Sequence, residues 1–407
     1  MNVGIVTTWF ERGAAYVSRQ YAQALRHDHE VFIYARGGEG RAVGDPSWDD
    51  GSSITWGKDL SRLGFQWIDL ADFEKWLRTK RIEVVLFNEQ AWWPPILLCR
   101  RLGIKTAAYV DYYTEETIPF FRAYDLLICN TRRHRSAFDW HPQCAYLPWG
   151  TETDIFRPQT LDRVENGSVT FFHSCGMNPK RKGTDFLLRA FQTLDAPNAR
   201  LVIHSQVEIE RLLPEQREGL VQLKSKGRLT VRRETVGPPG LYHLGDVYVY
   251  PSRLDGIGLT IAEAMACGLP VIVTDAPPMN EFIQEDIGRA ISVSRWSARA
   301  DGYYWPQATV DLDSLRQCLQ YYIDRSDQVP GFKRMARDYA ERSLNWTKNA
   351  EPLPDLIKNS HMLDVREMDD LEARIDRYEQ NRMSLKARFY LKAPQVAGAL
   401  LSVGQRI

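Results

Sequence analysis

The chain has 407 residues, of which 44% are hydrophobic and 26% charged, and its 52 basic side chains balance 52 acidic ones. This composition is typical of soluble globular domains and excludes a mainly disordered or fibrous chain. The zero formal net charge gives no overall basic field, so we expect no nucleic-acid partner. At roughly 100–200 residues per domain, the length predicts two or three domains.

The cysteines and the start of the chain indicate the compartment. Six cysteines are scattered without a Cys-x-x-Cys pair, which favours neither a zinc cluster nor a disulfide framework. Scattered free thiols suit a reducing environment. The residues after Met1 lack the pattern of a signal peptide, and no apolar run approaches the roughly 20 residues of a transmembrane helix. A cytoplasmic protein is therefore expected.

Short apolar runs alternate with helical periodicity in the first half of the chain. Val3–Val6 and Val31–Tyr34 are predicted as strands with a helix from Ala15 to Arg26 between them, and Gly37–Gly57 is predicted as a long loop. The later predicted strands of this half are Val84–Phe87, Thr106–Val110, Leu126–Cys129 and Ala145–Leu147. These runs lack period-2 alternation, which indicates a parallel sheet covered on both faces.

A second series of strands and helices begins at Val169–Phe172. Its predicted helices are Asp185–Leu194 and Leu259–Cys267, and its further strands are Leu201–His204, Leu229–Arg232, Val247–Tyr250 and Val271–Val273. Both halves therefore predict doubly wound α/β sheets. The polar stretch 156–167 is the predicted linker, and two such halves suggest a cleft between them. Ligands of open parallel sheets bind at the carboxyl ends of the strands.

The last part of the chain differs in character. Phe332–Leu344 is predicted to be helical, residues 364–382 are densely charged, and residues 382–407 hold five basic side chains and no acidic one. The resulting domain boundaries are 1–160, 161–335, 336–360 for helices that return toward the first domain, and 361–407 for a charged helical tail.

The most informative segment runs from Pro251 to Val273 as strand, glycine-rich turn, helix, Gly-Leu-Pro stop and strand. Gly256 and Gly258 let a ligand approach the backbone closely. The helix that opens after them presents free N–H groups, which suit a diphosphate. Asp255 and Glu263 bracket the turn with seven residues between them, and a carboxylate there can accept hydrogen bonds from sugar hydroxyls.

This segment resembles the signature of the retaining glycosyltransferases of family 4, which is two carboxylates separated by seven residues and then Ala-Met-Ala-x-Gly-x-Pro-Val. The first carboxylate is usually Glu, and here it is Asp255. The resemblance extends over about residues 1–350. It implies the GT-B fold, in which two Rossmann-like, doubly wound α/β domains face a central cleft, here followed by a helical C-terminal tail.

Further elements of that family are matched residue by residue. Gly13 and Ala14 resemble its Gly-Gly loop, which meets the donor diphosphate. Lys182 matches the lysine that neutralises the diphosphate, and the arginine usually found six residues earlier is Gly176 here, so Lys180 or Arg181 would have to supply that charge or it is missing.

Two further carboxylates are candidates. Asp111 follows a strand of the first domain, where it positions the acceptor or the donor sugar, or simply forms a turn. Glu281 matches a carboxylate after the last core strand and ranks below Glu263.

The resemblance implies transfer of a sugar from a nucleotide-diphosphate donor to an acceptor hydroxyl, with retention and without an essential metal or other cofactor. Lys182, Asp255 and Asp111 are the expected catalytic residues. The expected donor-binding residues are Gly13, Ala14, Arg181, Lys182, Gly256, Ile257, Gly258, Leu259, Thr260, Glu263 and Glu281. The acceptor is expected to be a glycan, a lipid-linked sugar or another hydroxyl compound.

Several alternatives stay open. A nucleotide-sugar 2-epimerase of the same fold, or a catalytically weak sugar-nucleotide-binding homologue, would carry similar motifs. Asp311-Leu312-Asp313 spells the metal-binding Asp-x-Asp of other glycosyltransferases, but it precedes a predicted helix and favours capping. The basic tail could form a short interfacial helix for peripheral membrane contact, or pack on the protein or on a second copy.

Overall fold

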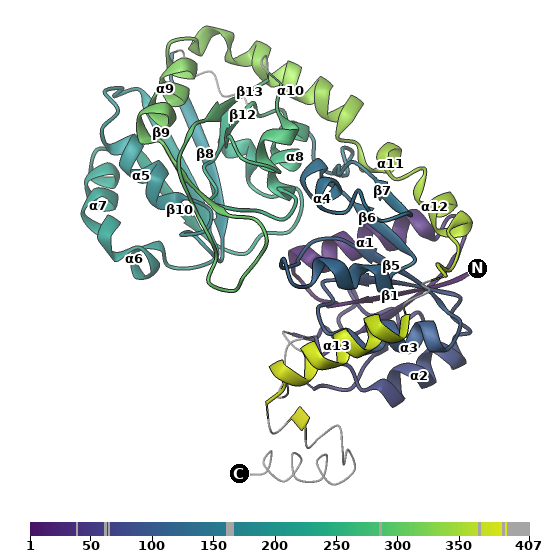
Figure 1. The fold of residues 1–407 in the computed structure, drawn as a ribbon. Helices are drawn as coiled ribbons and strands as arrows, with labels where there is room; N and C mark the ends of the chain where they lie inside the picture. Colours follow the sequence, from purple (N-terminus) through teal and green to yellow (C-terminus); the bar gives the residue numbers. More distant parts are fainter. Residues whose placement is uncertain are drawn as a thin grey trace. The chain divides into compact units, whose positions relative to one another are not determined.

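The computed structural model describes residues 1–37, 40–60, 63, 66–159, 167–284, 287–364, 368–384 and 387–388. The chain forms two compact units, whose elements are labelled in Figure 1. The first unit comprises residues 1–129, 137–145 and the chain from residue 352 onward, and the second comprises residues 130–136 and 146–351. Described residues from both ends of the sequence therefore belong to the first unit.

A seven-stranded sheet forms the centre of the first unit, in the order β3-β2-β1-β4-β5-β6-β7. Neighbouring strands from β3 to β6 pair in parallel, and the order reverses between β1 and β4. The strands are β1 Asn2–Thr7, β2 Glu30–Ala35, β3 Ile54–Trp56, β4 Val84–Asn88, β5 Lys105–Tyr109, β6 Leu126–Cys129 and β7 Cys144–Tyr146. Every residue of β4 and β6 is buried, as expected for parallel strands covered on both faces.

Helices from both ends of the chain pack in the first unit. They are α1 Gly13–Leu25, α2 Leu70–Thr79, α3 Pro94–Arg101, the 3₁₀ helix η1 Ile118–Ala123, α12 Leu353–Asn359 and α13 Met368–Arg382. Helix α1 is amphipathic because Val17, Tyr21 and Leu25 share its buried face. The late segments are tied to early ones by side chains. Lys105 Nζ donates to the carbonyl oxygen of Ser360 (2.8 Å), and Arg100 donates to that of Leu363 (2.8 Å).

The second unit contains a six-stranded parallel sheet in the order β10-β9-β8-β11-β12-β13. Its order reverses between β8 and β11, which is where ligands bind in doubly wound sheets. The strands are β8 Val169–Gly176, β9 Ala199–Ser205, β10 Leu229–Arg233, β11 Val247–Tyr250, β12 Val271–Thr274 and β13 Gly288–Ile291. A separate antiparallel pair consists of β14 Val293–Ser297 and β15 Gln307–Val310.

The helices of the second unit follow most of these strands. They are α4 Arg132–Ala137, α5 Thr184–Gln192, α6 Ile209–Leu212, α7 Arg217–Ser225, α8 Leu259–Ala266, α9 Leu312–Ile323, α10 Val329–Ser343 and α11 Trp346–Asn349, with 3₁₀ turns at η2 Pro214–Gln216, η3 Tyr242–Leu244, η4 Met279–Phe282 and η5 Ser326–Gln328. Helices α5, α7 and α9 contribute Leu187, Leu220 and Leu319 to one apolar core with the sheet.

The predicted strands and helices are confirmed with shifts of a few residues at their ends, but one prediction was wrong. Gly37–Gly57 is not a loop throughout, because β3 lies within it and pairs in parallel with Ile33–Ala35 of β2. This edge strand has only three residues, all half-buried, so it leaves no apolar run in the sequence. Residues 160–166 of the predicted linker and residues 365–367, 385–386 and 389–407 of the tail lie outside the described residues.

Candidate donor site in the second unit

With the exception of Glu281, the predicted donor residues of the second unit gather after the carboxyl ends of β8 and β11. The loop before α5 carries Arg181 and Lys182, and it is joined to the segment after β11 because Arg253 N donates to the carbonyl oxygen of Arg181 (2.8 Å). Gly183 makes this close approach possible. It has φ +73°, and a Cβ atom there would lie 1.9 Å from the carbonyl oxygen of Pro251. Only glycine fits this junction without displacing the backbone.

A buried histidine holds the same loop from beneath. His173 in β8 is fully buried, and its two ring nitrogens lie 2.8 Å from the Val249 carbonyl oxygen and 2.8 Å from Thr184 Oγ1. Burial lowers the pKa of His173 to about 4, so the ring is neutral and joins β8, β11 and the start of α5. The sequence offered no motif for this contact.

Asp255 is the centre of the cluster. One of its carboxylate oxygens lies 2.5 Å from Lys182 Nζ, accepts the hydroxyl of Tyr250 and lies 3.6 Å from Arg181. The other oxygen accepts the N–H groups of Gly256 (2.8 Å) and Gly258 (3.2 Å). Arg181 therefore lies at the cluster as its second cation. Lys180 instead pairs with Asp185 (3.4 Å) and Glu215 (3.6 Å).

Burial and charge set the ionisation of the pair. Burial lowers the pKa of Lys182 to about 8, against the opposing effect of the Asp255 carboxylate. Burial would raise the pKa of Asp255, but Lys182 and Arg181 outweigh it and hold that pKa far below its ordinary value. The side chains of Lys182 and Asp255 are only 15% and 13% exposed, so solvent screens their attraction little.

The helix α8 begins beside this pair. Gly258 precedes it with φ +90°, and its first N–H groups have no partners within the helix itself. A Cβ atom on Gly256 would meet nothing within 4 Å, so the backbone there borders open space. Ile257 is buried under the turn, while Leu259 and Thr260 form the half-buried first turn of the helix. A cation, a helix N-terminus and an open backbone edge form a typical site for phosphate groups.

Glu263 lies one turn further along α8. Its carboxylate accepts the hydroxyl of Tyr242 at 2.5 Å, and burial raises its pKa. Tyr242 belongs to η3 and is itself buried, so it fixes the orientation of the carboxylate. Sequence reasoning missed Tyr242, because it lies 21 positions before Glu263 and outside any motif.

Glu281 does not line this cluster in the way that Glu263 does. Its two oxygens accept the N–H groups of Arg132 (2.6 Å) and Arg133 (2.9 Å) at the start of α4. The same helix supports the turn after β11, since Arg133 donates to the carbonyl oxygen of Asp255 (2.6 Å) and His134 Nε2 donates to that of Gly256 (3.1 Å). Glu281 therefore caps α4, and the donor-binding role assigned to it stays a prediction.

The remaining predicted residues belong to the first unit. Gly13 opens α1, and the carbonyl oxygen of Ala14 accepts the side-chain amide of Asn88 (2.9 Å). Asp111 follows β5. Burial and the nearby Glu89 raise its pKa to about 8, although its carboxylate accepts the Tyr112 N–H at 2.7 Å. A carboxyl group of this kind is largely protonated at neutral pH and can donate a hydrogen bond.

The Asp-x-Asp sequence has a local role. Asp311 accepts the Ser314 N–H (2.8 Å) as the N-cap of α9, and Asp313 pairs with Arg316 on the same helix. Capping is therefore confirmed for Asp311. Within the described ranges, no three His, Cys, Asp or Glu side chains are grouped so that they could hold a metal ion.

Comparison with known proteins gives this site a family context. Residues 168–300 match the family model Glycosyl transferases group 1. That segment holds Lys182, Asp255 and Glu263, so the resemblance noted in the sequence is confirmed. The chain is 25% identical over 246 residues, 56% of its length and 59% of the relative, to a GDP-mannose-dependent phosphatidylinositol monomannoside mannosyltransferase of Corynebacterium glutamicum.

Other curated relatives carry related names. The lipopolysaccharide core mannosyltransferase LpsB of Rhizobium meliloti is 32% identical over 227 residues, which are 51% of this chain and 64% of LpsB. The mannosylfructose-phosphate synthase of Agrobacterium fabrum is 26% identical over 198 residues, 46% of this chain and 40% of that enzyme. The chain spans about half the length of the curated relatives that it matches.

Solved structures establish the fold. A glycosyltransferase of Rickettsia africae has a TM-score of 0.69 at 15% identity, covering 88% of this chain and 99% of that one. HepE of Anabaena, solved with UDP-glucose, has a TM-score of 0.66 at 13% identity, with coverages of 88% and 99%. The two Rossmann-like units are thus those of the GT-B fold. Across the described residues, none of the helices has both the length and the apolar character needed to cross a bilayer.

Proposed function

We propose that the protein is a retaining glycosyltransferase, which transfers a sugar from a nucleotide-diphosphate donor to an acceptor hydroxyl in glycan or glycolipid synthesis. One observation carries this proposal. Lys182, Arg181 and the N-terminus of α8 converge on Asp255 at the point where the strand order of the second sheet reverses. The match of residues 168–300 to Glycosyl transferases group 1 supports the same reading.

The diphosphate binds to Lys182, Arg181 and the first N–H groups of α8. As the bond from the sugar to the diphosphate breaks, negative charge builds on the leaving phosphate, so a fixed cation stabilises the transition state more than the ground state. Lys182 pairs with Asp255 before the donor arrives. Donor binding therefore redistributes this pair, so that Lys182 contacts the phosphate and Asp255 accepts a hydroxyl of the donor sugar.

Glu263 binds the ribose diol, with Tyr242 holding its carboxylate in place. The acceptor binds to the first unit, where Asp111 positions its hydroxyl, and the leaving phosphate accepts the proton of that hydroxyl during attack on the same face of the sugar. The reaction needs no essential metal, since lysine, arginine and the helix N-terminus neutralise the diphosphate. Relatives named as GDP-mannose-dependent and a fold relative solved with UDP-glucose leave the base open.

The cysteines and the names of the relatives indicate where in the cell the reaction takes place. None of the six cysteines, all of them described, forms a disulfide in the structure, which favours a reducing compartment and hence the cytoplasm. The relatives named for phosphatidylinositol mannosides and lipopolysaccharide favour a lipid-linked acceptor at a membrane surface. Peripheral contact through the basic tail belongs to this proposal, although Lys386, Lys392 and Arg406 lie outside the described residues.

A donor-hydrolysis panel over UDP-, GDP- and ADP-sugars tests the proposal without knowledge of the acceptor. We expect slow release of one nucleoside diphosphate, unaffected by EDTA and abolished in Lys182→Ala. Release together with a 2-epimerised sugar would indicate the epimerase alternative. Donor binding with no turnover on any acceptor would indicate the weak homologue. Loss of activity with EDTA would contradict the metal-independent mechanism.

A further inference from the structure

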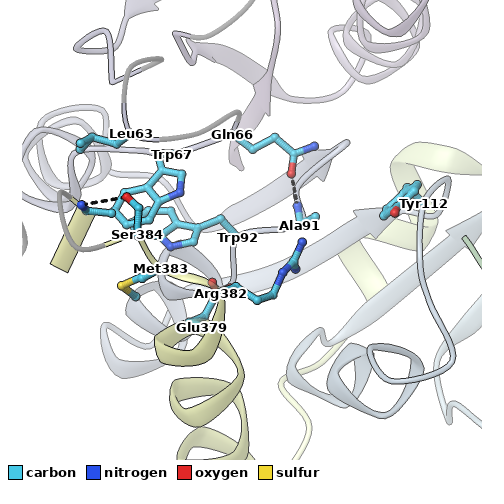
Figure 2. A pocket seen from close by; sticks show the side chains of 11 residues that line it. Leu63, Gln66, Trp67, Ala91, Trp92, Tyr112, Glu379, Arg382, Met383 and Ser384 are labelled. Carbon is cyan, nitrogen blue, oxygen red and sulfur yellow. Dashed lines mark hydrogen bonds between the residues drawn. The ribbon is translucent and has the colours of Figure 1, made fainter. Parts of the chain in front are cut away.

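A cavity of 490 Å³ lies in the first unit, and none of the donor residues predicted in the second unit is among its lining residues. It lies beyond the carboxyl ends of β4 and β5 and is closed on one side by the end of α13, as Figure 2 shows. Its volume falls within the roughly 300–1,000 Å³ range of small-molecule pockets. Its lining residues are Leu63, Gln66, Trp67, Ala91, Trp92, Tyr112, Glu379, Arg382, Met383, Ser384 and Ala387.

Two stacked indole rings form the floor of this cavity. The rings of Trp67 and Trp92 lie 4.7 Å apart at an angle of 17°, and both residues are buried. Among the described atoms, Nε1 of Trp92 is buried without a hydrogen-bond partner. Because protein atoms close off this N–H, the two indoles offer a ligand in the cavity only apolar ring surface.

Polar groups hold the cavity in shape. Gln66 Oε1 accepts the Ala91 N–H at 2.5 Å, and the side chain of Gln90 donates to the carbonyl oxygens of Gln66 (3.0 Å) and Trp92 (2.8 Å). These bonds fix the loop that carries Trp67 against the loop that carries Trp92. The cavity is therefore preformed and costs a ligand little ordering.

The last turn of α13 supplies the opposite wall. Glu379 accepts the Trp93 N–H at 3.0 Å, which ties the helix to the segment after β4. Arg382 is exposed at the helix end and donates to the hydroxyl of Tyr378, while Met383 and Ser384 follow it around the cavity. The wall thus offers one carboxyl group and one guanidinium group, together with hydroxyl and thioether surface.

We propose that this cavity binds a sugar residue of the acceptor, and that the end of α13 determines which sugar fits. Indole ring surface, a guanidinium group and a carboxyl group together match a ring that has an apolar face and an equatorial set of hydroxyls. The exposed guanidinium of Arg382 can donate to a sugar hydroxyl, whereas an acyl chain offers it no acceptor. The cavity adjoins Tyr112, the residue after Asp111, so a sugar there lies next to the proposed acceptor position. The inference rests on the proposed function.

The binding test uses the full chain labelled with ¹⁵N-tryptophan, with the indole signal of Trp92 assigned by Trp92→Phe. The probes are methyl α-mannopyranoside, methyl α-glucopyranoside and methyl α-galactopyranoside, and dodecylphosphocholine is the lipid probe. We expect at least one methyl glycoside to shift the Trp92 indole signal, because a sugar packed against the ring changes its surroundings. A shift only with dodecylphosphocholine would overturn the proposal. The absence of a shift with all four probes would also overturn it.

Variants at the exposed end of α13 give the second test. Arg382→Ala should raise the dissociation constant of the binding glycoside roughly tenfold, as expected for the loss of a charge-assisted bond. Ser384→Trp should abolish binding by filling the cavity. Arg377→Ala, an exposed arginine of the same helix, is the matched control and should bind as the wild type does. Equal affinities in all three variants would overturn the assignment.

The same experiments separate this inference from the proposed function. If the glycoside binds but no nucleotide sugar is turned over, the cavity is a carbohydrate site in a protein with another activity. If turnover occurs while Arg382→Ala and Ser384→Trp keep the wild-type KM for the acceptor, the transferase proposal stands and the cavity assignment is wrong.

Discussion

The ammonium group of Lys182 lies 2.5 Å from a carboxylate oxygen of Asp255, across a gap of 73 positions in the chain. The pair occupies the place where an incoming diphosphate would need the lysine. In the proposed function, donor binding is therefore an exchange of partners for Lys182. The predictions below follow from this relationship and from the groups around it.

Lys182→Ala should reduce kcat more than it weakens donor binding, because the charge on the leaving group peaks in the transition state. Losses of about 10²–10³-fold in kcat are typical when one such stabilising group is removed. The measurement compares kcat with the dissociation constant of the same donor. Lys180→Ala is the matched control, because that side chain is 58% exposed and pairs away from Asp255. A Lys182 variant with normal kcat and weaker donor binding would show instead that Lys182 stabilises the bound donor and the transition state equally.

Glu263→Gln should weaken the binding of the nucleoside diphosphate by about tenfold, because a charge-assisted bond to the ribose becomes a neutral one. Tyr242→Phe should give a smaller loss, because it frees the carboxylate without removing it. Calorimetric titration measures both. Glu218→Gln, at an exposed position of α7, serves as the control. Unchanged affinity in a folded Glu263→Gln protein would remove Glu263 from the ribose site.

Asp255→Glu restores the residue that is usual in the resembling family, yet we expect it to lower turnover by about ten- to a hundredfold. One carboxylate oxygen of Asp255 already contacts Lys182, and the other accepts the N–H groups of Gly256 and Gly258. An added methylene would move the carboxylate away from at least one of these sets of partners. Turnover of each donor in the panel measures the effect, with the exposed Asp275→Glu as the control. Faster turnover in Asp255→Glu would identify Asp255 as a damaged position rather than an adapted one.

Affinity for UDP or GDP should fall as the pH rises through about 8, the pKa to which burial lowers that of Lys182 from 10.5. Below this pH the ammonium is present and attracts the diphosphate. Above it the amine is neutral, so affinity falls by up to about tenfold per pH unit. Titrations across this range measure the slope, which Lys182→Ala should flatten. A wild-type slope that persists in the variant would assign the effect to another group.

Docking of α13 should weaken as the pH rises from 4.5 to about 7, and change little beyond that. Burial raises the pKa of Glu379 to about 7, with Asp376 adding to the effect and Arg382 and the Trp93 N–H opposing it. A carboxyl group with a raised pKa stabilises the folded state below its unfolded pKa, and this contribution is lost as it ionises through the folded pKa. Hydrogen exchange of residues 368–382, corrected for intrinsic rates, measures the docking. Glu379→Gln should remove the pH dependence, whereas Asp369→Asn should keep it.

The elements built from contiguous patterns could be predicted from the sequence. The segment from Pro251 to Val273 folds as a strand, a turn, helix α8 and the strand β12, because its glycines, its apolar runs and its Gly-Leu-Pro stop are all local signals. Lys182 and Asp255 lie close together because they follow β8 and β11, which are neighbours in a doubly wound sheet. The edge strand β3 was missed, because three half-buried residues carry no apolar run.

Contacts between distant residues could not be predicted in this way. Glu281 caps α4 across 149 positions, and Tyr242 orients Glu263 from a 3₁₀ turn. The cavity of Trp67 and Trp92 is completed by Glu379, which reaches the Trp93 N–H across 286 positions. Such pairings depend on where the chain returns after many elements, and no local pattern of side chains encodes that return.

The first unit is discontinuous, and this has a consequence for synthesis in the cell. Its strands β1 to β6 emerge from the ribosome early, but the chain that hydrogen-bonds to Lys105 and Arg100 emerges only after the whole second unit has been made. During translation the second unit can therefore fold while the first still exposes the surface that α12 and α13 will cover. The chain most needs a chaperone while this surface is exposed. Stop codons placed before residue 353 would leave it exposed permanently and should yield insoluble protein.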